Sequence, residues 1–264
     1  ACHSKVKKIR YILRTKTPRQ GIFMRKTMQL QYKFLAIILT IMLSCAQYGF
    51  AAFTLEDERK LGKEFYDKLD QNNFLIKDRQ LNDYITKIGN LVLAQSTKAP
   101  FNYTFSIVNS SAINAFATPG GYIYIHKGLI AAVDTEAELA GVIAHELAHA
   151  NARHVASIIE KSTRLSIATM AAILAAAFLG GGGDAAAAVA AFSMAGASSL
   201  TLKYQREHEE EADRLGITYL SQAGYNPGAS VSFLRLIKRH EFLSKSIPSY
   251  LRTHPGTDER IFYL

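Results

Sequence analysis

The sequence predicts an α+β fold that is mainly α-helical and contains one small antiparallel sheet. Apolar residues recur at three- and four-residue steps in 55–69 and 80–94, which is typical of surface helices. Apolar and polar residues alternate in 101–108 and 121–126, which indicates half-buried strands. Nearly every segment after residue 135 has a helical pattern. The sheet is therefore expected between two helical parts of the chain.

The second expected strand follows a strong turn signal, the run Thr118-Pro119-Gly120-Gly121. The small antiparallel sheet is thus expected directly before the helical part that begins at residue 135. The two early helices carry no residue pattern with evident chemistry, so we expect them to serve as scaffold. We find no internal repeat and no second domain in the body of the chain.

The charge of the chain is concentrated at its N-terminal end. The 264 residues are 48% hydrophobic, which is ample for a core, and carry a formal net charge of +9. Residues 1–33 hold ten Lys or Arg and no acid, so the remainder has 21 basic residues against all 22 acidic ones. The body is close to neutral. This distribution argues against nucleic acid as a partner, because a basic binding face is missing.

The N-terminal segment has the parts of a secretory signal peptide. Basic residues after Met24 precede an apolar run at 34–43, and small residues follow up to Ala51. We expect residues 1–23 to be an upstream extension, 24–51 a signal peptide and 52–264 the working domain, exported to the periplasm. An uncleaved N-terminal anchor is an alternative, and lipid attachment at Cys45 is another.

Both cysteines of the chain, Cys2 and Cys45, lie in this leader. The predicted domain at 52–264 has none, which excludes disulfides and cysteine ligands from it. A metal ion in this domain would have to be held by histidine, glutamate or aspartate side chains.

Two apolar segments, 165–179 and 185–200, flank the glycine run at 180–183. Each has 15 or 16 residues, fewer than the roughly 20 that a membrane-spanning helix needs. One interpretation is that they form buried helices of the core. The other is a hairpin that makes a peripheral membrane contact through 165–200 or covers the active site.

The stretch "VIAHELAHANAR" contains the residues with the clearest chemistry. His145 and His149 are four residues apart, so on a helix their imidazoles lie on one face and can bind a single metal ion. Glu146 is rotated away from this pair but stays close enough to reach a water molecule beside the metal. Two ligands and a general base on one turn are typical of the H-E-x-x-H zinc peptidases.

A third ligand is needed, and His154 has the wrong spacing for it. The extended pattern H-E-x-x-H-x-x-G-x-x-H requires glycine at 152 and histidine at 155, where Ala152 and Val155 stand. We therefore expect His154 to be a surface or capping residue.

Glu209 and Asp213, in the stretch "REHEEEADRLG", are better candidates. They are four residues apart on an expected helix, so both carboxylates can face the same way. Glu209 would complete a His, His, Glu zinc site with an open fourth position. Asp213 could accept a hydrogen bond from a ligand imidazole and fix its tautomer. Taken alone, this acidic cluster is more typical of a solvated helix face.

The order of these motifs resembles that of a known family. "HELAH", then "EEEADRLG", then "THPGT" ending in Arg260 are similar to the HtpX-like and CAAX-prenyl-protease-like zinc metallopeptidases. The resemblance is strongest to the soluble periplasmic branch, which includes the assembly-enhancing proteases of the outer membrane. The stretch at 114–130, "NAFATPGGYIYIHKGLI", matches the same family, and the resemblance covers about residues 55–264.

The resemblance implies a zincin-like domain with its small sheet beside the H-E-x-x-H helix. It implies one Zn²⁺ per chain, held by His145, His149 and Glu209, with Glu146 as general base. It places Asp213 behind the ligands.

His254 and Arg260 match the family's late histidine and arginine, which lie near the metal. Their expected roles are as donors to the oxyanion of the tetrahedral intermediate, or, for His254, occupation of the open zinc position in a resting state. Both alternatives remain at this point.

The expected function is that of a zinc metalloendopeptidase acting on unfolded or misassembled envelope proteins. A strand within 114–124 would hold an extended polypeptide substrate by edge pairing. A chaperone-like assembly factor with a self-occluded zinc site is the main alternative, and a surface helix without metal is a second. No feature of the sequence indicates an oligomeric state.

Overall fold

The structure of the chain is a computed structural model. The structure describes residues 53–96, 100–161, 167, 170–171, 174, 199–244 and 246–264. The expected upstream extension and signal peptide lie outside the described residues, as do almost all of the two apolar segments expected within 165–200. The described residues belong to one unit, Phe53–Leu264.

Two amphipathic helices open the described chain, as the apolar spacing predicts. Helix α3 covers Leu55–Gln71, and α4 covers Arg79–Leu93. Thr54 begins α3 with a capping box, in which its side chain accepts from the Asp57 amide and the Asp57 carboxylate accepts from the Thr54 amide.

The sheet has three strands in the order β1-β3-β2. They are β1 (Thr104–Val108), β2 (Ala115–Thr118) and β3 (Tyr122–His126). Strands β2 and β3 pair antiparallel, whereas β1 and β3, the strands expected at 101–108 and 121–126, pair in parallel. The expectation of an antiparallel sheet is therefore wrong for β1, and the sheet is mixed. Alternation of apolar residues indicates which face of a strand is buried and does not indicate its direction.

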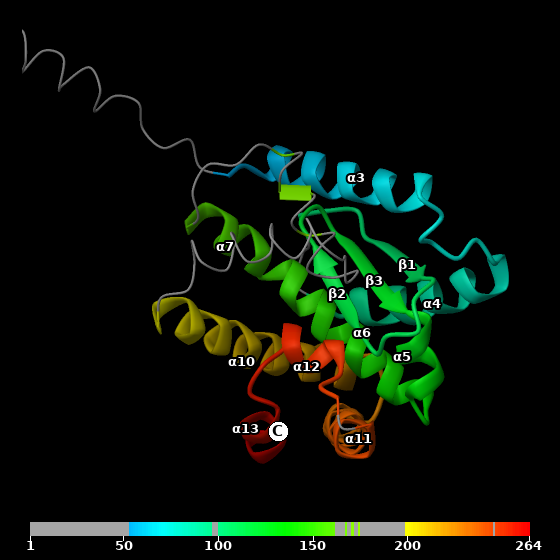
Figure 1. The fold of residues 1–264 in the computed structure, drawn as a ribbon, viewed down its shortest axis with the longest axis vertical. Helices are drawn as coiled ribbons and strands as arrows, with labels where there is room; N and C mark the ends of the chain where they lie inside the picture. The colour runs from blue at the N-terminus through cyan, green and yellow to red at the C-terminus, as the bar shows by residue number, and fades with distance from the viewer. Residues whose placement is uncertain are drawn as a thin grey trace, which may run out of the picture. The chain divides into compact units, whose positions relative to one another are not determined.

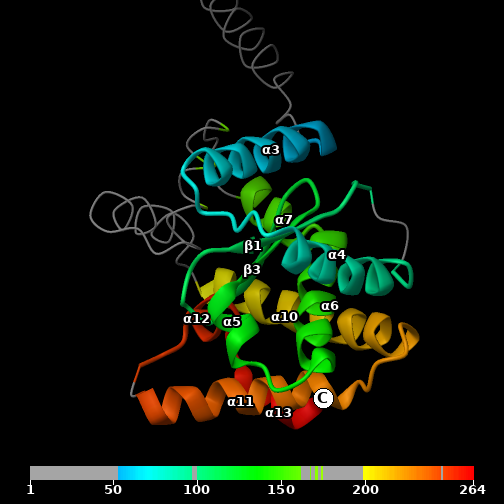
Figure 2. The same ribbon diagram turned by 90° about the vertical axis from the view of Figure 1, so that its right-hand side faces the viewer.

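The sheet is covered on both faces by helices (Figures 1 and 2). Ile123 and Ile125 of β3 belong to the larger core, which they share with α4 and the helices beyond the sheet. Tyr124, between them, faces the opposite way and packs against Phe65 of α3. The remaining helices are α5 (Lys127–Ala132), α6 (Glu136–Asn151), α7 (His154–Lys161), α10 (Ser199–Gln222), α11 (Gly228–Ser244), α12 (Ser249–Thr253) and α13 (Thr257–Tyr263).

Helix α6, which carries the H-E-x-x-H motif, is the centre of the domain. A capping box between Thr135 and Glu138 fixes its start, and every residue from Glu138 to Ala150 is buried. The sheet and α4 lie on one side of α6, and α10 and α11 pack on the other (Figure 2). A helix buried all round is held in place by its neighbours, which makes it a rigid support for polar groups.

A glycine lets α10 approach α6 closely at the position of the motif. A Cβ atom on Gly216 would lie 3.2 Å from backbone atoms of Ala144 and His145. Gly216 follows Asp213 by three residues and Glu209 by seven, so all three lie on the face of α10 that meets α6.

Among the described residues, no helix is both long enough and apolar enough to cross a membrane.

Candidate metal centre

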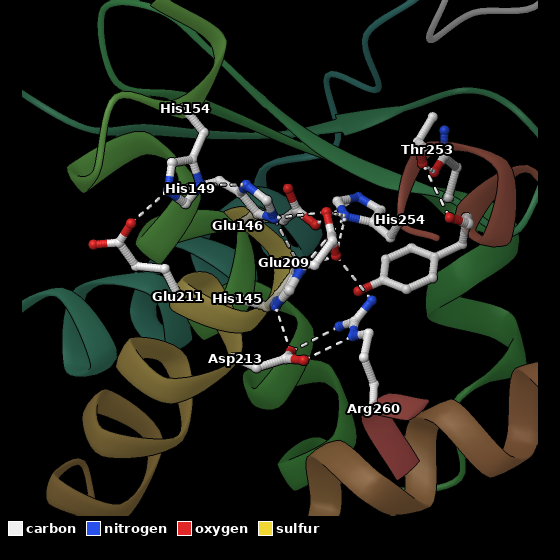
Figure 3. A network of polar contacts seen from close by, with 12 residues as sticks. His145, Glu146, His149, His154, Glu209, Glu211, Asp213, Thr253, His254 and Arg260 are labelled. Carbon is white, nitrogen blue, oxygen red and sulfur yellow. Dashed lines mark hydrogen bonds and ion pairs between the residues drawn. The ribbon is translucent and has the colours of Figure 1, made fainter. Parts of the chain in front are cut away.

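The two histidines of α6 point to the same place, as their spacing predicts. His145 Nε2 and His149 Nε2 are 3.0 Å apart, and both side chains are buried (Figure 3). Glu146 lies on the same turn and is 1% exposed.

Helix α10 brings the two expected carboxylates to these histidines. Glu209 Oε2 lies 3.3 Å from His145 Nε2, and Glu209 Oε1 lies 3.3 Å from His149 Nε2. Asp213, one turn further on, lies 3.0 Å from the other ring nitrogen of His145, Nδ1. Glu209 and Asp213 are therefore on the buried face of α10. Other acidic residues of the cluster, such as Glu210, are exposed to solvent, as its composition would suggest.

The C-terminal helices supply the remaining expected residues. His254 is the C-cap of α12, and its Nδ1 lies 3.4 Å from His145 Nε2 and 3.2 Å from Glu209 Oε1. Arg260 of α13 is 3% exposed and reaches the carboxylates of α10. Residues separated by more than a hundred positions in the sequence thus meet at one point.

The geometry of these atoms fits a tetrahedral metal ion. The four side chains that each offer one ligand atom within 4.8 Å of the others are His145, His149, Glu209 and His254. Ligands at about 2.0–2.1 Å from a tetrahedral Zn²⁺ lie about 3.3–3.4 Å from one another. The separations between these atoms, 3.0 to 3.4 Å, agree with that spacing. The donor set of nitrogen and carboxylate oxygen also suits zinc.

A charged network supports His145 from behind. Asp213 receives two hydrogen bonds from Arg260, Nε to Oδ2 and Nη2 to Oδ1, both 2.7 Å long. Tyr263 Oη donates to Asp213 Oδ2 at 2.7 Å. The third guanidinium nitrogen, Arg260 Nη1, donates to Glu209 at 2.9 Å. The carboxylate that faces His145 is thereby fixed in orientation.

His149 is supported from behind by another histidine. His154 Nδ1 lies 2.9 Å from His149 Nδ1, and His154 Nε2 lies 3.2 Å from Glu211 Oε2 (Figure 3). The His154 ring also stacks on His208, with 4.2 Å between centroids. His154 is 3% exposed, so the expectation of a surface or capping residue is wrong. The extended zinc pattern tests only whether a histidine can be a ligand, and His154 instead contacts His149, an expected ligand.

The carboxylates and the burial shift the pKa values of the two histidines in opposite directions. Burial opposes the charged form of His145, but the carboxylates of Asp213 and Glu209 outweigh it and raise the pKa to about 9. Burial lowers the pKa of His149 to about 3. Of the two imidazoles, His145 is therefore the more basic, because it lies beside two carboxylates.

Glu146 lies beside the ring of His254. Its Oε1 is 3.3 Å from His254 Nε2, and burial raises the pKa of the Glu146 carboxyl above its ordinary value. A raised pKa suits a group that must take up a proton and release it again. Tyr250 stacks on the other side of His254, with 4.4 Å between centroids, and positions that ring.

Besides His154, three contributors to the site were not expected from the sequence: Tyr250, Tyr263 and Glu211. Tyr250 and Tyr263 flank the late histidine and arginine, and aromatic residues near a polar motif give no distinct signal in a single sequence. Glu211 lies inside the acidic run, where its spacing from Glu209 places it on another face of the helix.

The fold and the site together define the class of the protein as a metallopeptidase of the H-E-x-x-H type. The model of Peptidase family M48 matches residues 77–264. The chain belongs to this family.

The relatives carry consistent names. The chain is 36% identical over 213 residues to the putative beta-barrel assembly-enhancing protease of Vibrio cholerae, a match that covers 80% of this chain and 44% of the relative. It is 31% identical over 214 residues to the beta-barrel assembly-enhancing protease of Escherichia coli, with the same coverage of 80% and 44%. The mitochondrial metalloendopeptidase OMA1 of Schizosaccharomyces pombe is 28% identical over 178 residues, covering 67% of this chain and 50% of the relative.

The chain spans less than half the length of these bacterial relatives. The family membership places the chain among the metallopeptidases.

Proposed function

We propose that the chain is a zinc endopeptidase that hydrolyses unfolded or misassembled proteins of the cell envelope. The observation that carries this proposal is the convergence of His145, His149 and Glu209 on one point beside Glu146, within a buried pair of helices. The envelope is proposed because the relatives are named beta-barrel assembly-enhancing proteases and because 24–51 has the pattern of a signal peptide, which favours a periplasmic location.

In this proposal His145, His149 and Glu209 hold the zinc ion. A bound zinc ion supplies Lewis acidity, which activates a water molecule and polarises the peptide carbonyl. Glu146 takes a proton from the attacking water and gives it to the leaving amine as the carbon–nitrogen bond breaks. Asp213, held by Arg260 and Tyr263, keeps the His145 ring oriented.

Arg260 is proposed to act through these carboxylates. Its Nε, Nη1 and Nη2 all donate to Asp213 or Glu209. A guanidinium with these donors engaged is better suited to orienting the ligands than to stabilising an oxyanion, the role that the family resemblance left open.

The edge strand β2 is proposed to bind the substrate backbone. The His126 amide donates to the Asn114 carbonyl, so Asn114 and His126 are a hydrogen-bonded pair. Hydrogen-bonded and non-hydrogen-bonded pairs alternate along antiparallel strands, and the backbone groups of Ala115 and Ala117 therefore point away from β3. Among the described residues, no backbone hydrogen bond joins these two residues to another segment, and both are buried, so a substrate could pair with them only after this edge becomes accessible. Edge pairing recognises extended backbone, which favours unfolded segments as substrates. A peripheral membrane contact through 165–200 remains part of the proposal on composition alone.

His254 is proposed to occupy the fourth ligand position in a resting state. Its Nδ1 lies within the ligand set and its Nε2 lies 3.3 Å from Glu146, so the ring occupies the space between the proposed metal position and the base. Catalysis then requires that His254 withdraw. The same contact favours a second candidate function, a chaperone-like assembly factor whose zinc site stays closed.

The Glu146→Gln protein tests the proposed function. It is expected to bind one zinc ion per chain and to lose casein cleavage by about 100- to 10,000-fold, because the general base is removed. Wild-type protein without metal would contradict the zinc site. A Glu146→Gln protein that restores envelope function fully in cells would favour the chaperone-like role.

The His254→Ala protein tests the resting state. Occupation of the fourth position predicts faster casein cleavage than wild type, and a catalytic role of His254 predicts slower cleavage. A matched control is Thr253→Val, next to this histidine, which removes a hydroxyl that bonds Asn114 and leaves the imidazole in place.

A further inference from the structure

The proton positions around His149 follow from its contact with His154. The two Nδ1 atoms are 2.9 Å apart, a distance that requires one hydrogen between them. Either ring can be the donor on distance alone. The direction determines which nitrogen of His149 keeps a lone pair, and therefore whether Nε2 can bind a metal ion.

The carboxylate of Glu211 decides this direction. A carboxylate only accepts, so His154 Nε2, at 3.2 Å, carries the hydrogen and donates to Glu211. In a neutral His154 ring the other nitrogen, Nδ1, then has a lone pair and accepts. His149 must donate from Nδ1, which leaves the lone pair of its Nε2 directed at the ligand cluster (Figure 3).

We propose that His154, oriented by Glu211, is a positioning residue that fixes His149 in the tautomer that binds metal through Nε2. This inference rests on the metal site proposed above. It assigns to His149 a support that differs in chemistry from the Asp213 carboxylate behind His145.

The backbone holds His154 firmly in this place. Helix α6 ends at Asn151 and α7 begins at His154, so only two residues, Ala152 and Arg153, separate the two helices. Arg153, in this turn, has the left-handed φ of 55° and forms an ion pair with the buried Glu58 of α3. Stacking on His208 and burial then leave the ring little freedom. Because stacking, burial and the contact with Glu211 restrict the His154 ring, that ring can hold the His149 ring in one orientation.

Two substitutions of His154 separate hydrogen bonding from packing. In His154→Asn, the amide oxygen can take the place of Nδ1 and accept from His149. In His154→Gln, the longer side chain reaches the place of Nε2 near Glu211 and leaves no acceptor at the Nδ1 position. Both variants lose the ring, so they share any effect of lost packing.

Zinc affinity, measured by competition with a chelator, is expected to fall by about 10- to 100-fold in His154→Gln. It is expected to stay close to wild type in His154→Asn. Equal affinity in His154→Gln and wild type would overturn the inference, and so would an equal loss in both variants, because that would show packing alone. If wild-type protein binds no zinc, the proposed function fails instead.

A second measurement does not depend on the variants folding. Long-range ¹H–¹⁵N NMR spectra of the metal-free wild-type protein, with the His149 ring assigned through its own backbone and Cβ resonances, report which nitrogen of His149 carries the proton. The inference expects the proton on Nδ1. A proton on Nε2 in the wild-type protein would overturn it.

Discussion

The two histidines of the H-E-x-x-H motif on α6 are supported in different ways. His145 faces a carboxylate, Asp213, whose charge is balanced by the buried Arg260. His149 faces a second imidazole, His154, which in turn meets the half-exposed Glu211. The first support is a buried ion pair and the second a chain of hydrogen bonds. We therefore expect the first to affect folding stability strongly and the second to affect mainly the proton position on its ligand.

The largest effect is expected from Asp213→Asn, which removes the charge from the His145 support. Arg260 would stay buried with only Glu209 as a charged partner, and breaking such a pair costs about 3–5 kcal/mol. The free energy of unfolding of the metal-free protein, measured in urea, should fall by this amount. The exposed Glu210→Gln on the same helix is the control. A loss no greater than that of His154→Asn would show that the two supports are equivalent.

The sequence predicted Asp213 as the support of His145 but did not predict His154 as the support of His149, for a physical reason. His145, His149, Glu209 and Asp213 follow from helical spacing, which is local and can be counted. The contact of His154 with Glu211 joins residues 57 positions apart and depends on how α7 leaves α6. The left-handed Arg153 that sets this turn is not a residue type that predicts such a conformation.

The same distinction applies to the fold. The helices α3 and α4 follow from apolar spacing, and their observed bounds differ from 55–69 and 80–94 by at most two residues. The parallel pairing of β1 with β3 could not be predicted, because it depends on which edge of the hairpin β1 occupies.

A buried histidine outside the site sharpens the comparison, because it shows the effect of burial without a carboxylate. Burial lowers the pKa of His126 to about 4, and a hydrogen bond with the Ala112 backbone raises this pKa by a smaller amount. The pKa of His126 in the folded state lies below its value of about 6.5 in the unfolded state. The contribution of neutral His126 to the free energy of unfolding is therefore fully present above about pH 6.5. As the pH falls from about 6.5 to about 4, about 3 kcal/mol of stability should be lost.

Urea unfolding between pH 4 and 7 measures this loss, with His126→Leu as the reference that cannot titrate there. The wild-type protein should lose more stability over this range than the variant. Parallel pH profiles for the two proteins would contradict the expectation.

A smaller effect is expected from Gly216→Ala, which acts on the helix contact beside His145. The new Cβ would lie 3.2 Å from backbone atoms of α6, which cannot rotate away. The overpacking cost of about 1–3 kcal/mol exceeds the gain of about 1 kcal/mol from alanine in a helix. Zinc affinity should fall too, because α10 carries Glu209.

Gly141→Ala is the matched control, since its Cβ would meet the Ser230 side chain at 3.1 Å, and a hydroxyl can move. It should be close to neutral in the same unfolding and zinc-binding measurements. If the two alanine variants have the same unfolding free energy and zinc affinity, the close backbone contact at Gly216 does not determine the position of α10 against α6.

The smallest effect is expected from Tyr263→Phe, which removes one hydrogen bond from the His145 support. Tyr263 Oη donates to Asp213 Oδ2, but Arg260 donates to both oxygens of the same carboxylate. The carboxylate therefore keeps its orientation, and the loss should be about 0.5–1.5 kcal/mol in urea unfolding, the worth of a single bond. Zinc affinity should change little, because Arg260 still holds Asp213 in place. The His154→Gln variant differs, since His154 is the only acceptor for His149 Nδ1 among the described contacts. A large drop in zinc affinity with Tyr263→Phe would mean that the ion pair alone does not orient Asp213.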